Sequence, residues 1–295
     1  SNSYFNNVVS CQVLDPHTQI LCSMSDCYGS SVSWKLAVGG QSSNSVSNAL
    51  SCAIPIINSV TNILLNTSGG DIFYVDGLNF GDVSSIVRVT YGPDGYGYTA
   101  SCIVHTAGTL LKCTAAPGIG YGHAIVVKVA DLSSSPLTNA LSYKCPVITT
   151  VYGPGVSGPT TGNDIVYISG SQFGPFGYSP SNIIVTYGPT GIEYLATGCT
   201  LVSAHTNIQC LNVPGTGKDH RWQLSIATQK SNFYEFTAYA PPVIYYYTTN
   251  GTTTSGSMLI YIHGFNFGYL YSKITSITYT GYNNTIYDVT TRCSL

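Results

Sequence analysis

The stretches Tyr74-Val-Asp-Gly-Leu-Asn-Phe-Gly81, Tyr167-Ile-Ser-Gly-Ser-Gln-Phe-Gly174 and Tyr261-Ile-His-Gly-Phe-Asn-Phe-Gly268 are three copies of one pattern. The spacing between their first glycines is 93 residues from Gly77 to Gly170 and 94 residues from Gly170 to Gly264. A fixed period in a sequence indicates a tandem array of similar structural units. The chain is therefore predicted to be built from repeats of about 90–100 residues.

Short strand-like segments surround each copy in the same order. A proline start precedes the copy, a strand ending in tyrosine follows it, and an alternating strand closes the unit. The starts are Pro55-Ile-Ile57, Pro146-Val-Ile148 and Pro242-Val-Ile244, the tyrosines are Tyr91, Tyr187 and Tyr279, and the closing strands are Ala124–Val129 and Trp222–Ile226. No helical periodicity is present. Short alternating strands in units of this size predict an all-β fold of tandem immunoglobulin-like β-sandwiches.

The ten cysteines do not follow a metal-binding pattern. Three pairs have ten residues between their partners: Cys11 and Cys22, Cys102 and Cys113, Cys199 and Cys210. No C-x2-C pair occurs, although structural zinc sites usually contain one. An even spacing places the partners opposite each other on a hairpin with a two-residue turn, centred at Pro16-His17, Ala107-Gly108 and Ala204-His205. The pairs are therefore predicted to be disulfides formed in an oxidising compartment.

The proline start, the Gly-x-x-Phe-Gly pattern, the Tyr-ending strand and the cysteine pair followed by Pro117-Gly118 or Pro214-Gly215 together resemble the IPT/TIG domain. This is the immunoglobulin-like module of plexins, of some transcription factors and of large cell-surface proteins in amoebae and other protists. The resemblance covers essentially the whole chain. Its paired cysteines resemble the extracellular members, and the basic loops and DNA-binding partner domain of the transcription factors are absent. The resemblance thus implies an extracellular repeat protein of the protist cell-surface type, with no nucleic-acid partner.

The repeat phase divides the chain into four segments. Residues 1–53 match the second half of a repeat, residues 54–145 and 146–240 are complete repeats, and residues 241–295 match a first half. Cys11 and Cys293 are 282 residues apart, or three periods, so residues 283–295 repeat the phase of residues 1–13. One interpretation is a longer covalent array, which this overlap in phase favours. The other is a polymer in which the last half repeat of one chain completes the first half repeat of the next.

The remaining cysteines fall outside the repeated pairs. Cys27 stands where the other repeats have the glycine of Pro-Gly, and Cys52 ends the closing strand of the same half repeat. Both places lie at one end of an immunoglobulin-like sandwich, which predicts a Cys27–Cys52 bridge. Cys145 has no partner in the pattern and is either a buried free thiol or a cross-link to another chain. The partner of Cys293 is left open.

Charged residues make up only 7% of the chain, against about a quarter in ordinary soluble domains. Such a surface offers little repulsion against association, so we expect attached glycans or self-association into a polymer or array. The sequons at Asn66, Asn250 and Asn283 are predicted glycan sites, and the first two have the same repeat phase. The 24 tyrosines either cover the sheets or form an adhesive face. The sequence contains no run of about 18 apolar residues, so no membrane-spanning segment is predicted.

No grouping of residues predicts catalysis, a metal site or a cofactor. His17 and His205 share a turn position, Asp71, Asp76 and Asp164 have too few neighbouring acids for calcium, and ligand spacing is lacking at His105, His123, His220 and His263. We therefore expect a non-enzymatic extracellular structural protein that forms a glycosylated filament or surface coat. A cell-surface adhesion ectodomain that binds a partner protein is the alternative. A carbohydrate-binding array attached to a secreted hydrolase is the weakest interpretation.

Overall fold

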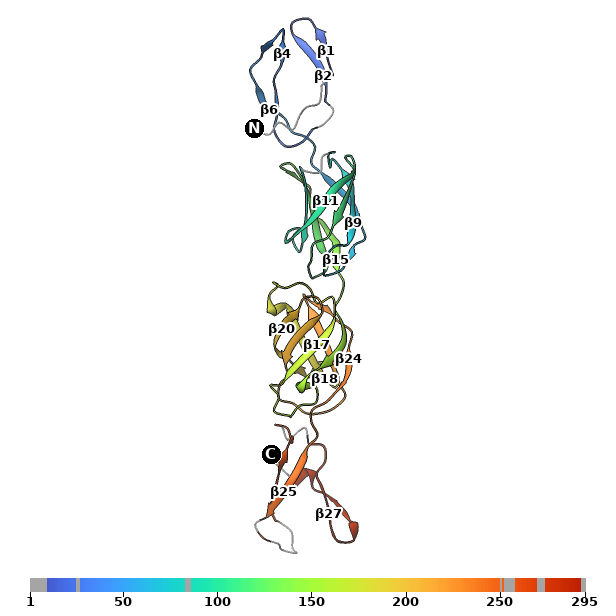
Figure 1. Cartoon of the computed structure of the whole chain (residues 1–295), viewed down its shortest axis with the longest axis vertical. Coiled ribbons are helices and arrows are strands. Elements are labelled where there is room, and N and C mark those ends of the chain that lie inside the picture. The colour runs from blue at the N-terminus through green and yellow to red at the C-terminus, as the bar shows by residue number, and fades with distance from the viewer. Residues whose placement is uncertain are drawn as a thin grey trace. The chain divides into compact units, whose positions relative to one another are not determined.

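The computed structural model describes residues 10–24, 27–82, 86–249, 251, 258–269 and 274–292 (Figure 1). In these residues the regular structure is β-strand apart from short 3₁₀ turns, which confirms the predicted all-β fold. Contacts divide the chain into two compact units, residues 1–144 and residues 145–295.

The first unit contains a complete sandwich of two layers, whose strand pairings are antiparallel except for one parallel pairing at an edge. One layer has the strand order β7–β9–β12–β11, and the other has the order β11–β10–β13–β15 with β8 at its edge and β14 beside β13. The strands are β7 (Ile56–Thr61), β8 (Leu64–Leu65), β9 (Ile72–Leu78), β10 (Val87–Gly92), β11 (Tyr98–Thr106), β12 (Leu110–Thr114), β13 (His123–Val129), β14 (Leu132–Ser133) and β15 (Leu137–Tyr143). β11 joins both layers because its first residues pair with β10 and its later residues pair with β12.

The second unit repeats this plan. Its layers have the orders β16–β17–β21–β20 and β19–β18–β22–β23, with β24 paired to β22. The strands are β16 (Val147–Tyr152), β17 (Ile165–Ser171), β18 (Ile183–Gly188), β19 (Tyr194–Leu195), β20 (Thr197–Ser203), β21 (Asn207–Leu211), β22 (His220–Ile226), β23 (Gln229–Lys230) and β24 (Tyr234–Thr237). Here the strand that passes between the layers is interrupted at Ala196, whose amide donates to the Val185 carbonyl.

The core of each sandwich follows from the two-residue period of its strands. Successive side chains of a strand point to opposite faces, so alternate residues of β9 enter the core. Phe73 and Val75 are fully buried, and in the second unit Val166 and Ile168 take the same places. Tyr91 and Tyr187, which end the strands predicted from the tyrosine pattern, are also buried.

The repeated Gly-x-x-Phe-Gly pattern marks a close approach of two strands. A Cβ atom added to Gly170 would lie 1.9 Å from the Val147 carbonyl oxygen and 2.7 Å from Cζ of Phe173. The opening strand and the buried phenylalanine ring thus occupy the space that any side chain would need. The final glycine, Gly174, has a φ of 87°, a left-handed conformation that favours glycine. The same steric restriction recurs at Gly77 and Gly264.

Further strands lie in the two segments that the sequence pattern predicts to be half repeats. The first contains β1 (Ser10–Asp15), β2 (Gln19–Ser23), β3 (Val32–Trp34), β4 (Ala37–Val38), β5 (Gln41–Ser42) and β6 (Val46–Leu50). The second contains β25 (Val243–Thr249), β26 (Ile260–Phe265), β27 (Thr278–Thr280) and β28 (Ile286–Asp288). Each consists of separate two-stranded pairings: β1–β2, β3–β6, β4–β5, β25–β26 and β27–β28.

Candidate functional site

The repeated cysteine pairs are disulfides across a hairpin. The structure joins Cys11 to Cys22, Cys102 to Cys113 and Cys199 to Cys210, with Cα–Cα distances of 4.0, 4.0 and 4.1 Å. In the first two hairpins the partners are directly opposed in the strand register. Cys113 and Cys210 are fully buried, so these bridges reach from the hairpin into the core.

The expected two-residue turns are wrong. Residues 107–109 form a three-residue loop between the paired residues Thr106 and Leu110, and the register shifts by one residue between Val104 and Thr106. A three-residue loop with a bulge keeps the cysteines opposite each other, as a two-residue turn would. The middle loop residue is left-handed in each hairpin, with φ of 69°, 75° and 66° at His17, Gly108 and His205.

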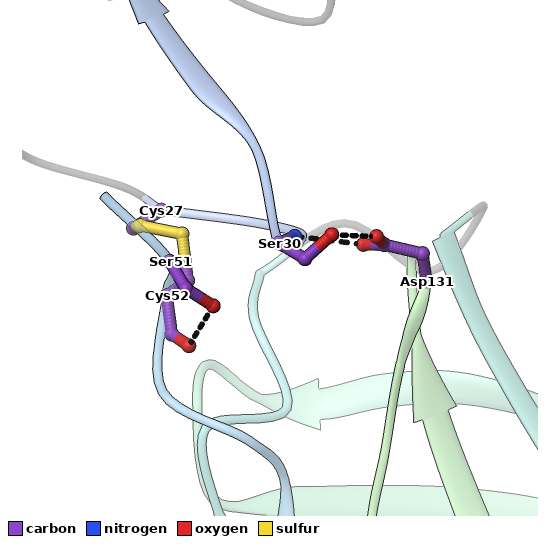
Figure 2. The surroundings of a disulfide bond; sticks show 5 residues. All are labelled: Cys27, Ser30, Ser51, Cys52 and Asp131. Carbon is purple, nitrogen blue, oxygen red and sulfur yellow. Dashed lines mark hydrogen bonds between the residues drawn. A yellow bond between two sulfur atoms is a disulfide. The ribbon is translucent and has the colours of Figure 1, made fainter. Parts of the chain in front are cut away.

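The segment that precedes the first complete sandwich contains a disulfide and forms hydrogen bonds to that sandwich close to it. Cys27 and Cys52 form a disulfide with a Cα–Cα distance of 5.6 Å. Next to it, Figure 2 shows Ser30 facing Asp131, whose Oδ1 accepts from the Ser30 amide at 2.9 Å while the Ser30 hydroxyl donates to Oδ2. These bonds lower the pKa of Asp131 below its usual value. The hydroxyl of Tyr28 also donates to Asp82.

The predicted glycan sites differ in their surroundings. Asn283 is exposed in the loop between β27 and β28. Asn66 is half-buried, its Nδ2 donates to Asp71 at 2.9 Å, and its Oδ1 accepts from Lys144 at 2.9 Å. Asn250 lies outside the described residues, as does Cys293. Asn283 is therefore the more accessible of the two described sequons.

Cys145 is an exposed free thiol. The alternative of a buried free thiol is wrong, because Cys145 lies immediately before β16 with its side chain exposed. Its Sγ atom accepts a hydrogen bond from Gln229 Nε2 at 3.8 Å.

A buried cluster of tyrosines and histidine, which sequence reasoning missed, surrounds the Pro-Gly loop of each sandwich. In the first, the hydroxyls of Tyr91 and Tyr143 lie 2.8 Å apart, and they bond the carbonyl and amide of Ala116. Tyr98 bonds both backbone groups of Ile119, and His123 Nε2 donates to the Ile119 carbonyl at 3.0 Å. The loop is thereby fixed from both sides.

The second sandwich contains the same cluster. Tyr187 and Tyr239 lie with their hydroxyls 2.6 Å apart at Val213, and Tyr194 bonds both backbone groups of Thr216. His220 occupies the place of His123, and the signal that could have revealed the cluster is this recurrence at one repeat phase. Burial raises the pKa of Tyr143 and of Tyr239, and it lowers the pKa of both histidines. These groups therefore stay neutral and structural near neutral pH.

No group of three or more metal-ligating side chains occurs among the residues that the structure describes. Glu193 lines a groove of the second unit together with Tyr194 and Tyr269. Partial burial raises the pKa of Glu193, but hydrogen bonds from Thr190 and Ile192 outweigh it and leave the pKa at about 2. This carboxylate is a turn-stabilising acceptor and is unsuited to proton transfer near neutral pH.

The half repeats expose surfaces that are core in the complete sandwiches. Ile244 and Ile262 are 62% and 38% exposed, whereas Ile148 and Ile168 at the same repeat positions are 3% and 0% exposed. Helices long and apolar enough to cross a bilayer are not found in the described part of the chain.

The two complete repeats match a known protein family. The model of the IPT/TIG domain matches residues 55–143 and 146–238. Among solved structures, the chain is similar to the plexin A4 extracellular region, with 17% identity, a TM-score of 0.29, and coverage of 64% of this chain and 18% of that chain. It is also similar to the surface glycan-binding protein PbSGBP-B from Prevotella bryantii, with 10% identity, a TM-score of 0.42, and coverage of 63% and 43%.

The adhesin InvE from Yersinia pseudotuberculosis is similar as well, with 12% identity, a TM-score of 0.35, and coverage of 67% of this chain and 65% of that chain. The chain spans less than a fifth of the plexin A4 region and less than half of PbSGBP-B. No curated protein sequence matches it. The two segments matched by the family model make up more than half of the chain, and the protein therefore belongs to the IPT/TIG domain family.

Proposed function

We propose that the protein is a non-enzymatic extracellular structural protein whose tandem immunoglobulin-like repeats build a glycosylated filament or surface coat. The observation that carries this proposal is the repetition itself, with the same disulfide hairpin and the same buried tyrosine–histidine cluster in successive units. Repetition of a stable module extends a chain without adding chemistry. We also propose that the protein is of the protist cell-surface type, as the resemblance of its sequence pattern implies.

Two further observations support it. The disulfides are typical of oxidising compartments outside the cytosol. The chain has few charged residues, and the ion pairs Lys218–Asp219 and Arg221–Glu235, which lie among the described residues, are solvent-exposed. A neutral surface of this kind favours association or a covering of sugars.

Immunogold electron microscopy of native material tests the proposal. Antibodies against the chain should label filaments or a continuous layer outside the cell. Label inside the cytosol, or on isolated molecules without order, would contradict the proposed structural function. Glycopeptide mass spectrometry tests the N-linked part separately, and unmodified peptides at Asn66, Asn250 and Asn283 would remove that part alone.

An adhesion ectodomain is the second candidate, and exposed aromatic side chains favour it. Tyr121, Phe176 and Phe236 are 62%, 63% and 84% exposed in the complete repeats. Aromatic side chains are enriched at protein interfaces. If adhesion is the function, the soluble chain should bind cells and a variant with these three residues changed to serine should lose binding. Unchanged binding by that variant would contradict the assignment of these residues.

A further inference from the structure

The same contact between consecutive repeats occurs in both compact units. Tyr28 and Thr216 each stand six residues after the second cysteine of their hairpin, and each lies against the last glycine of the next Gly-x-x-Phe-Gly pattern along the chain. A Cβ atom added to Gly81 would lie 2.7 Å from Cε1 of Tyr28, and one added to Gly268 would lie 2.5 Å from Cγ2 of Thr216. A side chain of the preceding repeat therefore occupies the space beside this glycine.

The asparagine of the same pattern binds the linker that enters its repeat. Asn79 and Asn266 are left-handed, with φ of 63° and 62°. Their Nδ2 atoms donate to the carbonyl just before the opening proline, Ile54 at 2.9 Å and Pro241 at 3.1 Å. Oδ1 of Asn266 also accepts from the amide of Thr160, in the preceding sandwich, at 3.3 Å. One side chain thus connects the linker to the repeats on either side of it.

In the first unit, further hydrogen bonds join the two sides of this contact. Asp131 accepts from the amide and the hydroxyl of Ser30, as Figure 2 shows, and Asp82 accepts from the Tyr28 hydroxyl. Gly29, between the two donor residues, is buried and left-handed with a φ of 89°. A Cβ atom on Gly29 would lie 2.8 Å from Oδ1 of Asp131. Residues 28–30 therefore contact two loops of the following sandwich.

In the second unit, the buried tyrosine–histidine cluster fixes the loop that makes the contact. Tyr194 bonds both backbone groups of Thr216, the residue that lies against the last glycine of the next pattern. Tyr269, which follows that glycine, lines a groove with Leu195 and Pro214 of the second sandwich. The cluster thus holds in place the part of one repeat that meets the next.

We propose that the Gly-x-Asn-Phe-Gly pattern is a docking surface for the preceding repeat, and that its partner is the loop fixed after the second cysteine of that repeat's hairpin. The inference goes beyond the proposed function, because it concerns how consecutive repeats are joined whichever function they serve. Domains that are connected only by an exposed linker usually move relative to each other. A docked loop restricts that motion. The contacts in the two units involve different residues at equivalent positions and support the proposal separately.

Amide hydrogen exchange in the 295-residue chain tests the joint of the second unit. Asn266→Gly removes the acceptor of the Thr160 amide, and glycine tolerates the left-handed backbone. Exchange at Thr160 should become about 10-fold faster or more, since one hydrogen bond is lost. Asn284→Gly is the matched control, because Asn284 is left-handed with a φ of 61° but exposed, and it should leave Thr160 unchanged. Equal exchange at Thr160 in the wild type and in Asn266→Gly would overturn the proposal.

Gly81→Ala tests the joint of the first unit. Its added Cβ would press on the Tyr28 ring, so the Ser30 amide should lose its bond to Asp131 and exchange about 10-fold faster or more. Gly108→Ala is the matched control. Gly108 is left-handed with a φ of 75°, but a Cβ atom there meets nothing within 4 Å, so exchange at Ser30 should match the wild type.

The amide of Val127, a fully buried residue of β13, reports on opening of the same sandwich. Faster exchange at Ser30 with unchanged exchange at Val127 supports the joint. If both amides exchange faster in Gly81→Ala, Tyr28→Ser decides, because it leaves the glycine in place and should still speed exchange at Ser30. Wild-type exchange at Ser30 in either variant would contradict the docking of this repeat. None of these results changes the microscopy test of function.

Discussion

His123 and His220 are neutral residues held among tyrosine rings. Each is almost fully buried, and His123 Nδ1 and His220 Nε2 have no hydrogen-bond partner among the described residues. Burial lowers the pKa of each histidine below 6.5, and backbone hydrogen bonds offset only part of this shift. A proton added to either ring in the folded state would leave a charge in the core.

We predict that acid destabilises the first sandwich through His123. The unfolded chain binds a proton near pH 6.5 and the folded state binds it only at lower pH, so stability is fully present above about pH 6.5 and declines as the pH falls below it. Tyr91, Tyr98 and Tyr143 pack against the ring, and burial raises the pKa of Tyr91 and Tyr143. Urea unfolding at pH 8 and pH 5 should show a smaller difference for His123→Phe than for the wild type. The exposed His105→Phe variant should retain the wild-type difference.

The tyrosine pair makes a second prediction at this scale. Tyr143→Phe removes the hydroxyl that donates to the Ala116 carbonyl at 2.7 Å and lies against the Tyr91 hydroxyl. We expect the free energy of unfolding to fall by about 1–3 kcal/mol, because buried polar groups lose a partner. Chemical denaturation measures the change. Tyr152→Phe, at an exposed tyrosine, is the control, and an equal loss there would contradict the explanation.

Among the elements, the cysteine hairpin is the unit whose stability is easiest to isolate. Cys102→Ala together with Cys113→Ala should lower the free energy of unfolding by about 2–3 kcal/mol, since the bridge restricts a short loop of the unfolded chain. Denaturant unfolding under non-reducing conditions measures this. Cys145→Ala should leave stability unchanged, and a similar loss in that variant would show that the effect is not due to the bridge.

The elements that repeat in the sequence were predictable, and those assembled from distant residues were not. Identical spacing revealed the hairpin disulfides and the succession of strands along each unit. The turn length could not be read from spacing, because the bulge between Val104 and Thr106 compensates for the extra loop residue. The tyrosine–histidine cluster was missed because its members come from different strands, with Tyr91 and Tyr143 52 residues apart.

The contact between Ser30 and Asp131 joins residues 101 positions apart. No local pattern could indicate it, since a single serine and a single aspartate carry no periodicity.

At the scale of the whole molecule, the complete sandwiches lie in different compact units, divided between Lys144 and Cys145. We predict that calorimetry resolves their unfolding as separate transitions. Gly170→Ala should lower the transition of the second sandwich strongly, by about 3 kcal/mol or more, because its Cβ would lie 1.9 Å from the Val147 carbonyl oxygen. The transition of the first sandwich should not move. A shared shift of both transitions would show that the two units unfold together.

The pairing of β8 with β15 has a mechanical consequence for a chain that bears load. These strands are parallel, with Ser142 opposite Leu64 and Tyr143 opposite Leu65, and the Lys144 amide donates to the Leu65 carbonyl at 2.8 Å. Tension applied at the end of this sandwich acts along β15 and strains these bonds in shear. Bonds loaded in shear must rupture together, whereas bonds at an unzipping end rupture in sequence. The parallel pairing with β8 would thus resist tension applied along β15, the last strand of the repeat.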